Sequence, residues 1–213
     1  MLLRFFKQPL LAAVALGLMF ISTVATASDI QASRFIEGRD YEVKTQTRTP
    51  NNEIREFYSY WCGHCFGMQG VFEQLAQHVQ GRAVLVRNPV GILGGEAGKR
   101  SVNAYAVAKI LGIEDEFNQM LFENIHEKNL IPESSEDFVE IFKSLGVPEN
   151  LYKKEQIAFP TIGLVGEYEK WFEKSGIDAV PEIFINGKYL AKLDNIESIE
   201  DFNALIDYLL TLP

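Results

Sequence analysis

The chain has 213 residues, 47% of them hydrophobic, and carries a formal net charge of −9 at pH 7. This acidic balance argues against a nucleic-acid-binding protein. The length is ample for one domain with a sizeable core, or for one domain with an inserted lobe.

The N-terminal region resembles an export signal. Two basic residues precede an apolar stretch, Leu10 to Ile21, that is too short to span a bilayer comfortably. Ala25-Thr26-Ala27 then supplies a small-x-small cleavage site. We therefore predict a signal peptide over 1–27 and an exported mature chain that begins at Ser28; an uncleaved membrane anchor is the alternative.

The first half of the mature chain predicts a β-β-α-β order. Residues 41–44 and 54–60 are expected to be strands, and apolar residues recur at helical spacing from Phe66 to Val79. Residues 83–90 are expected to form a third strand. The segment between the second strand and the helix contains both cysteines of the chain.

The second half predicts a run of helices followed by a return to strands. Helices are expected over 96–111, 114–126, 136–145 and 160–174, with a short turn from Pro148. Asn186-Gly187 predicts a type I′ hairpin between strands 182–185 and 188–191, and a closing helix is expected over 199–210. The pattern indicates an α/β fold in which a mixed sheet has helices on its faces and an all-helical lobe inserted in the middle.

The cysteines form the motif Trp61-Cys62-Gly63-His64-Cys65 at a strand-to-helix junction. Free backbone N–H groups and the positive end of the helix dipole favour a thiolate there, so the pair is suited to disulfide exchange. A structural disulfide is the first alternative, but its four-residue loop would stabilise the fold by only roughly 2 kcal/mol. Zinc is the second; His78 and His126 lack the spacing of a zinc site, and we expect no metal.

Two segments resemble the DsbA family of periplasmic thiol:disulfide oxidoreductases. They run from Glu56 through Cys65 and from Gly176 through Tyr189, and the likeness extends to the Gly94-Gly95-Glu96-Ala97-Gly98 segment. The resemblance implies a periplasmic location and a thioredoxin fold with a helical insertion. On this basis residues 28–92 and 177–213 are expected to form the thioredoxin fold and 93–176 the helical lobe.

The chain departs from the DsbA pattern at two positions near the motif. Gly63 replaces the usual proline between the cysteines, which produces the dipeptide found in eukaryotic protein disulfide isomerases. Gln69 stands where the family often has an acid.

The motif suggests separate roles for its residues. Cys62, at the helix start, is expected to be the more exposed, attacking and leaving sulfur, and Cys65 the buried resolving thiol. His64 lies between them and is expected to donate a hydrogen bond or positive charge to the Cys62 thiolate. Trp61 and Phe66 are expected to form an apolar rim that receives unfolded chains.

Three residues outside the motif are also candidates. The resemblance implies that Val180-Pro181 carries a cis peptide bond facing the disulfide, where the Val180 backbone can pair with an extended substrate. Glu56 shares a strand face with Ile54 and is expected to lie beneath the helix near Cys65, where burial raises its pKa and it assists proton transfer. Arg87, on the neighbouring strand, is either its charge partner or a surface residue.

The predicted function is oxidation of newly exported polypeptides by a monomer that a membrane partner resembling DsbB reoxidises. No organic cofactor motif is visible, and none is expected. The alternatives are a disulfide isomerase or reductase, which Gly63 makes conceivable, and a non-catalytic peptide-binding chaperone. Most members of a set of five phenylalanines at helical spacing are expected to be lobe core; the set is Phe117, Phe122, Phe138, Phe142 and Phe172.

Overall fold

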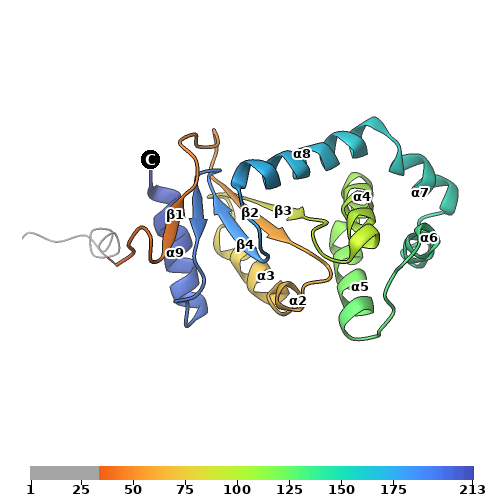
Figure 1. Ribbon diagram of the computed structural model, residues 1–213, viewed down its shortest axis with the longest axis horizontal. Coiled ribbons are helices and arrows are strands. Elements are labelled where there is room, and N and C mark those ends of the chain that lie inside the picture. Colours follow the sequence, from red (N-terminus) through yellow and green to blue (C-terminus); the bar gives the residue numbers. More distant parts are fainter. Residues whose placement is uncertain (1–33) are drawn as a thin grey trace, which may run out of the picture.

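The computed structural model describes residues 34–213, so the predicted signal peptide at 1–27 lies outside the described residues. A five-stranded sheet in the order β1-β5-β4-β2-β3 forms one end of the molecule (Figure 1). Strands β2 and β3 are parallel, and the other neighbouring pairs are antiparallel. The strands are β1 (Tyr41–Val43), β2 (Glu53–Tyr58), β3 (Val84–Pro89), β4 (Glu182–Ile185) and β5 (Tyr189–Ala191).

Alternation along the strands directs side chains to the two faces of the sheet. On β2, Ile54 belongs to a core built with α3 (Gln69–His78) and α9 (Ile199–Thr211), whereas Phe57 packs on the opposite face. Glu56 therefore lies on the face of Ile54, toward the helices that follow the cysteines. The sheet with helices on both faces confirms the predicted α/β class.

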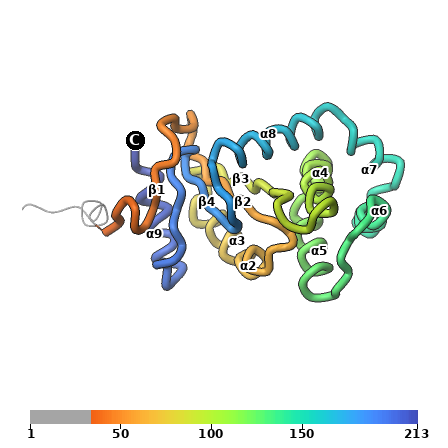
Figure 2. Tube along the Cα trace, in the orientation of Figure 1, coloured from red at the N-terminus to blue at the C-terminus, as the bar shows by residue number. Residues whose placement is uncertain are grey.

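The helical lobe lies between β3 and β4 in the chain and extends away from the sheet (Figure 2). Its helices are α4 (Gly95–Leu111), α5 (Glu114–His126), α6 (Ser135–Ser144), α7 (Glu149–Gln156) and α8 (Phe159–Ser175). Among helices of residues 34–213, none combines the length and the apolar character needed to cross a membrane.

The lobe core contains Phe117, Phe122, Phe138 and Phe142, all buried as predicted. The prediction that most of the five phenylalanines are lobe core is confirmed, and Phe172 is the exception. Helix α8 returns from the lobe to the sheet, and Phe172 near its end packs on Phe57, with 6.4 Å between ring centroids. Both cysteines belong to the lobe core cluster, so the motif lies where lobe and sheet meet.

Two helix predictions differ from the structure. The helix expected from Phe66 to Val79 is divided at Met68 into α2 (Gly63–Gly67) and α3, and glycines at 67 and 70 weaken the helix on both sides of this break. The short turn expected from Pro148 is the two-turn helix α7, which Pro148 precedes as N-cap.

Local side-chain and turn chemistry defines where two of the elements begin or end. Ser134 and Asp137 form a reciprocal capping box at α6. Both Asn186 and Gly187 adopt positive φ between β4 and β5, as a type I′ turn requires.

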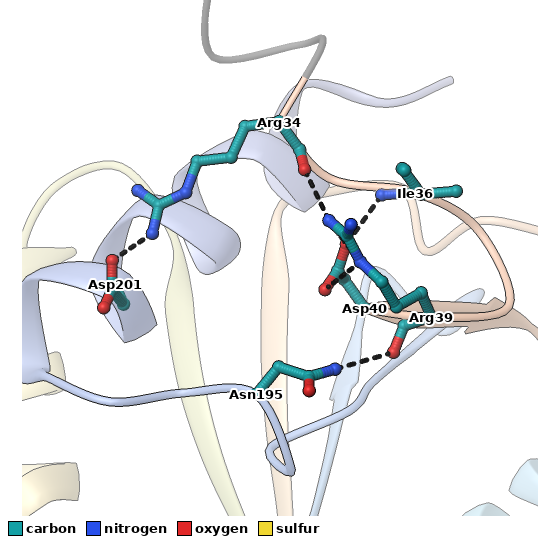
Figure 3. A network of polar contacts seen from close by, with 6 residues as sticks. All are labelled: Arg34, Ile36, Arg39, Asp40, Asn195 and Asp201. Atoms are coloured by element: carbon teal, nitrogen blue, oxygen red, sulfur yellow. Dashed lines mark hydrogen bonds and ion pairs between the residues drawn. The ribbon is translucent and has the colours of Figure 1, made fainter.

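A polar network attaches the first described residues to the C-terminal part of the chain (Figure 3). Arg34 forms an ion pair with Asp201 of α9, and Asn195 donates to the Arg39 carbonyl. The Arg39 guanidinium also binds Asp40, and this hydrogen bond lowers the pKa of the Asp40 carboxyl. The edge strand β1 is thereby held against the sheet.

Candidate active site

Cys62 lies at the N-terminus of α2, at the end of a turn closed by its own N–H donating to Ser59 O (3.1 Å). It is the N-cap residue, and its Sγ accepts a hydrogen bond from the Cys65 N–H at 3.1 Å. A sulfur at this position faces backbone donors and the positive end of the helix, both of which favour an anion. The geometry agrees with the placement expected from the sequence.

The two sulfurs differ in exposure. Cys62 is 8% exposed and Cys65 is fully buried. Burial raises the pKa of the Cys65 thiol far above its ordinary value, and the hydrogen bond with Cys62 raises it further. Cys65 therefore remains protonated at neutral pH, which fits the expected role of a buried resolving thiol.

The Val180–Pro181 peptide bond is cis and lies against Cys62. The Cys62 Sγ is 3.5 Å from the Val180 carbonyl oxygen, to which the thiol donates. The structure thus brings together two segments that are 118 residues apart. The cis bond and the contact of the Val180 backbone with the sulfur agree with what the resemblance implied.

His64 does not make the predicted hydrogen bond to Cys62 among the described residues. Its side chain is exposed and lines a groove of about 500 Å³ between the start of the active-site helices and the segment before α9. Apolar side chains, including Met68 and Phe202, line most of this groove, and Asp194 and Glu197 lie among them.

Glu56 lies within a buried polar chain beneath Cys65. It is fully buried, and the Arg87 Nε donates to its Oε2 at 3.0 Å. Burial raises the pKa of the Glu56 carboxyl, and Arg87 opposes that rise. Its Oε1 has no hydrogen-bond partner among the described residues. Arg87 is therefore the partner of Glu56, and the predicted location of the acid is confirmed.

Gln69 connects this pair to the motif. The Arg87 Nη2 donates to the Gln69 Oε1 at 2.6 Å, and the Gln69 Nε2 donates to the Cys65 carbonyl at 3.0 Å. A neutral amide can accept and donate at once, whereas a carboxylate could only accept. The departure from the family pattern thus has a structural use.

Sequence reasoning missed a second polar cluster at the end of β2. Asn118 Oδ1 accepts hydrogen bonds from Tyr58 and Tyr60, which also contact each other at 3.1 Å. Burial raises the pKa of both phenols, so they stay neutral donors. No motif signals Asn118, because it reaches the tyrosines only through docking of α5.

Trp61 and Phe66, the two aromatic residues beside the cysteines, contact different parts of the helical lobe and the loop before it. Trp61 packs on Gly94 of the loop before α4, whose positive φ and missing side chain leave room for the indole. Phe66 instead turns into the lobe and stacks on His126, with 5.0 Å between ring centroids. Within residues 34–213 no group of three or more His, Cys, Asp or Glu side chains could hold a metal ion.

Comparison with known proteins supports the relationship suggested by the motif. The profile of the family described as "DSBA-like thioredoxin domain" matches residues 53–206. The thiol:disulfide interchange protein DsbA of Dickeya dadantii is 27% identical over 198 residues, which cover 92% of each chain.

Solved structures agree in fold. A Proteus mirabilis DsbA variant with a non-covalently bound peptide is 27% identical and superposes with a TM-score of 0.77, over 84% of this chain and 99% of that one. The DsbA of Klebsiella pneumoniae, at 24% identity, covers 84% and 98% with a TM-score of 0.76 and shares the fold.

Proposed function

The chain belongs to the DSBA-like thioredoxin domain family, and from that premise we propose that it is a disulfide oxidase. It donates the Cys62–Cys65 disulfide to newly exported polypeptides through a mixed disulfide. The position of the Cys62 sulfur at the helix N-terminus, 3.1 Å from the Cys65 N–H, is the observation that carries the proposal. This arrangement stabilises a thiolate on the leaving sulfur, which is what a strong oxidant requires.

The reaction proceeds in two exchanges. A substrate thiolate attacks the Cys62 sulfur, the Cys62–Cys65 bond breaks, and the departing Cys65 sulfur takes up a proton. A second substrate thiolate then attacks the substrate sulfur of the mixed disulfide and expels Cys62 as a thiolate. The substrate dithiol loses two electrons and the protein disulfide gains them.

The magnitude of the oxidising force follows from the reduced state. A hydrogen bond to a charged group contributes about 1.5–3 kcal/mol and a helix N-terminus about 0.3–1 kcal/mol. Together they would stabilise the reduced protein by about 2–4 kcal/mol, or about 40–90 mV at about 30 mV per 1.4 kcal/mol. The equilibrium then favours transfer of the disulfide to the client.

Supporting roles belong to the residues around the sulfurs. We assign the Val180 backbone and Pro181 to pairing with the extended substrate beside Cys62. We assign Glu56 to delivery of the proton that Cys65 takes up, because its buried carboxyl has a raised pKa and a free oxygen. His64 supplies positive charge to the thiolate when it is protonated.

The cellular setting completes the proposal. We propose that the signal at 1–27 directs the chain to the periplasm, where it acts as a monomer and a membrane protein resembling DsbB reoxidises it. The DsbA of Proteus mirabilis binds a peptide, and reduced exported polypeptides are the clients proposed here. We take 28–92 and 177–213 as the thioredoxin part and 93–176 as the lobe.

Oxidative refolding tests the proposal. A reduced protein with several cysteines is mixed with stoichiometric oxidised enzyme, and client disulfides are followed by mass spectrometry of alkylated samples. The wild type should form them within minutes. Cys65→Ala has no internal disulfide and is therefore loaded beforehand as a mixed disulfide of Cys62 with glutathione; client thiolates should displace the glutathione, and mixed disulfides with the client should accumulate. Cys62→Ser, treated in the same way, should form neither client disulfides nor mixed disulfides at position 62. Repair of scrambled client without net oxidation would identify an isomerase. A chaperone would be identified by two results together: the wild type does not oxidise the client, and the Cys62→Ser, Cys65→Ser double variant suppresses client aggregation as well as the wild type does.

A further inference from the structure

His126, the last residue of α5, contacts the two residues that flank the active-site motif. Its Nε2 lies 2.8 Å from the carbonyl oxygen of Tyr60, two residues before Cys62. Its ring stacks on Phe66, the residue after Cys65, with an interplanar angle of 11°. Helices α2 and α5 are neighbours in the fold (Figure 1). One side chain of the lobe thus contacts the chain on both sides of the cysteine motif.

The hydrogen bond defines the chemical state of the ring nitrogen. A carbonyl oxygen can only accept, so the His126 Nε2 must carry a proton and donate it to Tyr60. Tyr60 is fully buried, and its carbonyl would lose a partner if the ring were absent. The bond therefore holds the Tyr60–Trp61 peptide in one orientation.

That peptide lies inside the turn that delivers Cys62 to α2. The turn is closed by the Cys62 N–H donating to Ser59 O at 3.1 Å, and rotation of its central peptide would move the sulfur. The stack on Phe66 holds the other side of the motif. Alignment of the Cys62 sulfur with the Cys65 N–H depends on both sides staying in place.

We propose that His126 is a positioning residue that makes the protein more oxidising by holding the Cys62 sulfur in line with the Cys65 N–H. This rests on the proposed function. An N–H bond to a thiolate is stronger than one to an uncharged disulfide sulfur. Loss of alignment therefore destabilises the reduced protein more than the oxidised protein, and the protein becomes a weaker oxidant.

Three substitutions separate the two contacts. His126→Phe keeps the aromatic stack and removes the donor. His126→Gln keeps an N–H donor and removes the aromatic ring, and His126→Ala removes both. His78→Phe is the matched control, because His78 binds Asp207 on α9, away from the motif.

Equilibrium with reduced and oxidised glutathione provides the readout. The equilibrium constant for oxidation of glutathione by the protein should fall about fivefold in His126→Phe, which corresponds to a Cys65 N–H bond that favours the thiolate over the disulfide sulfur by roughly 1 kcal/mol less than in wild type. The constant of His126→Ala should be at least as low as that of His126→Phe. The constant of His126→Gln should lie close to the wild-type value, and that of His78→Phe should equal it. Urea unfolding should show the reduced form of His126→Phe losing more stability than the oxidised form.

A purely structural role would give a different result. Equal loss of stability in both oxidation states of His126→Phe, with an unchanged constant, would overturn the proposal. If His126→Ala does not fold, the equilibrium constants of His126→Phe and His126→Gln still test the proposal.

A wild-type reduction potential near the value of about −270 mV for thioredoxin, rather than the value of about −120 mV for DsbA, would refute the oxidase function alone. The ratio of the His126→Phe equilibrium constant to the wild-type constant tests the role of His126 whatever the wild-type potential is.

Discussion

Glu182, the residue after the cis proline, should make the stability of this protein fall as the pH rises toward neutrality. Burial raises the pKa of its carboxyl from 4.5 to about 7. Lys44 opposes the rise, whereas Asp178, Asp194 and Glu42 add to it. The folded protein therefore binds a proton at Glu182 in a range where the unfolded chain has released it.

The size and sign of the effect follow from proton linkage. Each pKa unit corresponds to about 1.36 kcal/mol, so the full rise would correspond to about 3 kcal/mol. Glu182 is only partly buried, and solvent screening reduces this to about 1–2 kcal/mol. Because the folded pKa is raised, the contribution is complete below pH 4.5 and is lost as the pH rises through about 7.

Glu182→Gln keeps the shape of the side chain and removes its titration. The variant should match wild type near pH 4 and exceed its free energy of unfolding by about 1–2 kcal/mol at pH 8. Urea unfolding of the reduced protein at several pH values measures the difference. Glu169→Gln, at an exposed position on α8, is the control and should follow wild type throughout. Parallel pH profiles of wild type and Glu182→Gln would refute the reasoning.

Three further substitutions test other parts of the structure. Glu56→Gln keeps a neighbour for Arg87 but cannot deliver a proton, so mixed-disulfide formation with a model peptide should slow at least about tenfold in stopped-flow fluorescence; an unchanged rate would argue against the proton-transfer role. Gly94→Ala adds a methyl group that collides with the Trp61 indole at a backbone position of positive φ. We expect the free energy of unfolding in urea to fall by about 1–3 kcal/mol and the tryptophan emission to change. Unchanged stability and emission would contradict the packing of Trp61 on Gly94. Ser134→Ala removes the N-cap acceptor of α6 and should lower stability by about 0.5–2 kcal/mol without changing the oxidation rate.

Local patterns were sufficient for much of the site. A strand, two cysteines and a helix follow one another without interruption, so the position of Cys62 at a helix N-terminus could be predicted from neighbours in the chain. Period-two alternation on β2 likewise indicated that Glu56 lies on the face of Ile54. The choice between a paired and a surface Arg87 was left open, because it depends on the parallel register that places Glu56 opposite Arg87.

Other features depend on where helices end and turn. The break at Met68 interrupts a regular apolar pattern, and the period alone predicted a continuous helix. Phe172 has helical spacing like the lobe phenylalanines, but α8 spans both the lobe and the sheet. An apolar period shows that a residue is buried without showing which core receives it.

The amino-acid sequence by itself indicated the main succession of strands and helices, the position of the cysteine pair at a helix N-terminus and the family, because these depend on local patterns along the chain. Only the tertiary structure decided that His64 faces a groove, that Gln69 links Arg87 to Cys65, and that His126 meets Tyr60. These contacts join segments far apart in the chain or depend on one rotamer among several, so they form only when the lobe packs against the sheet.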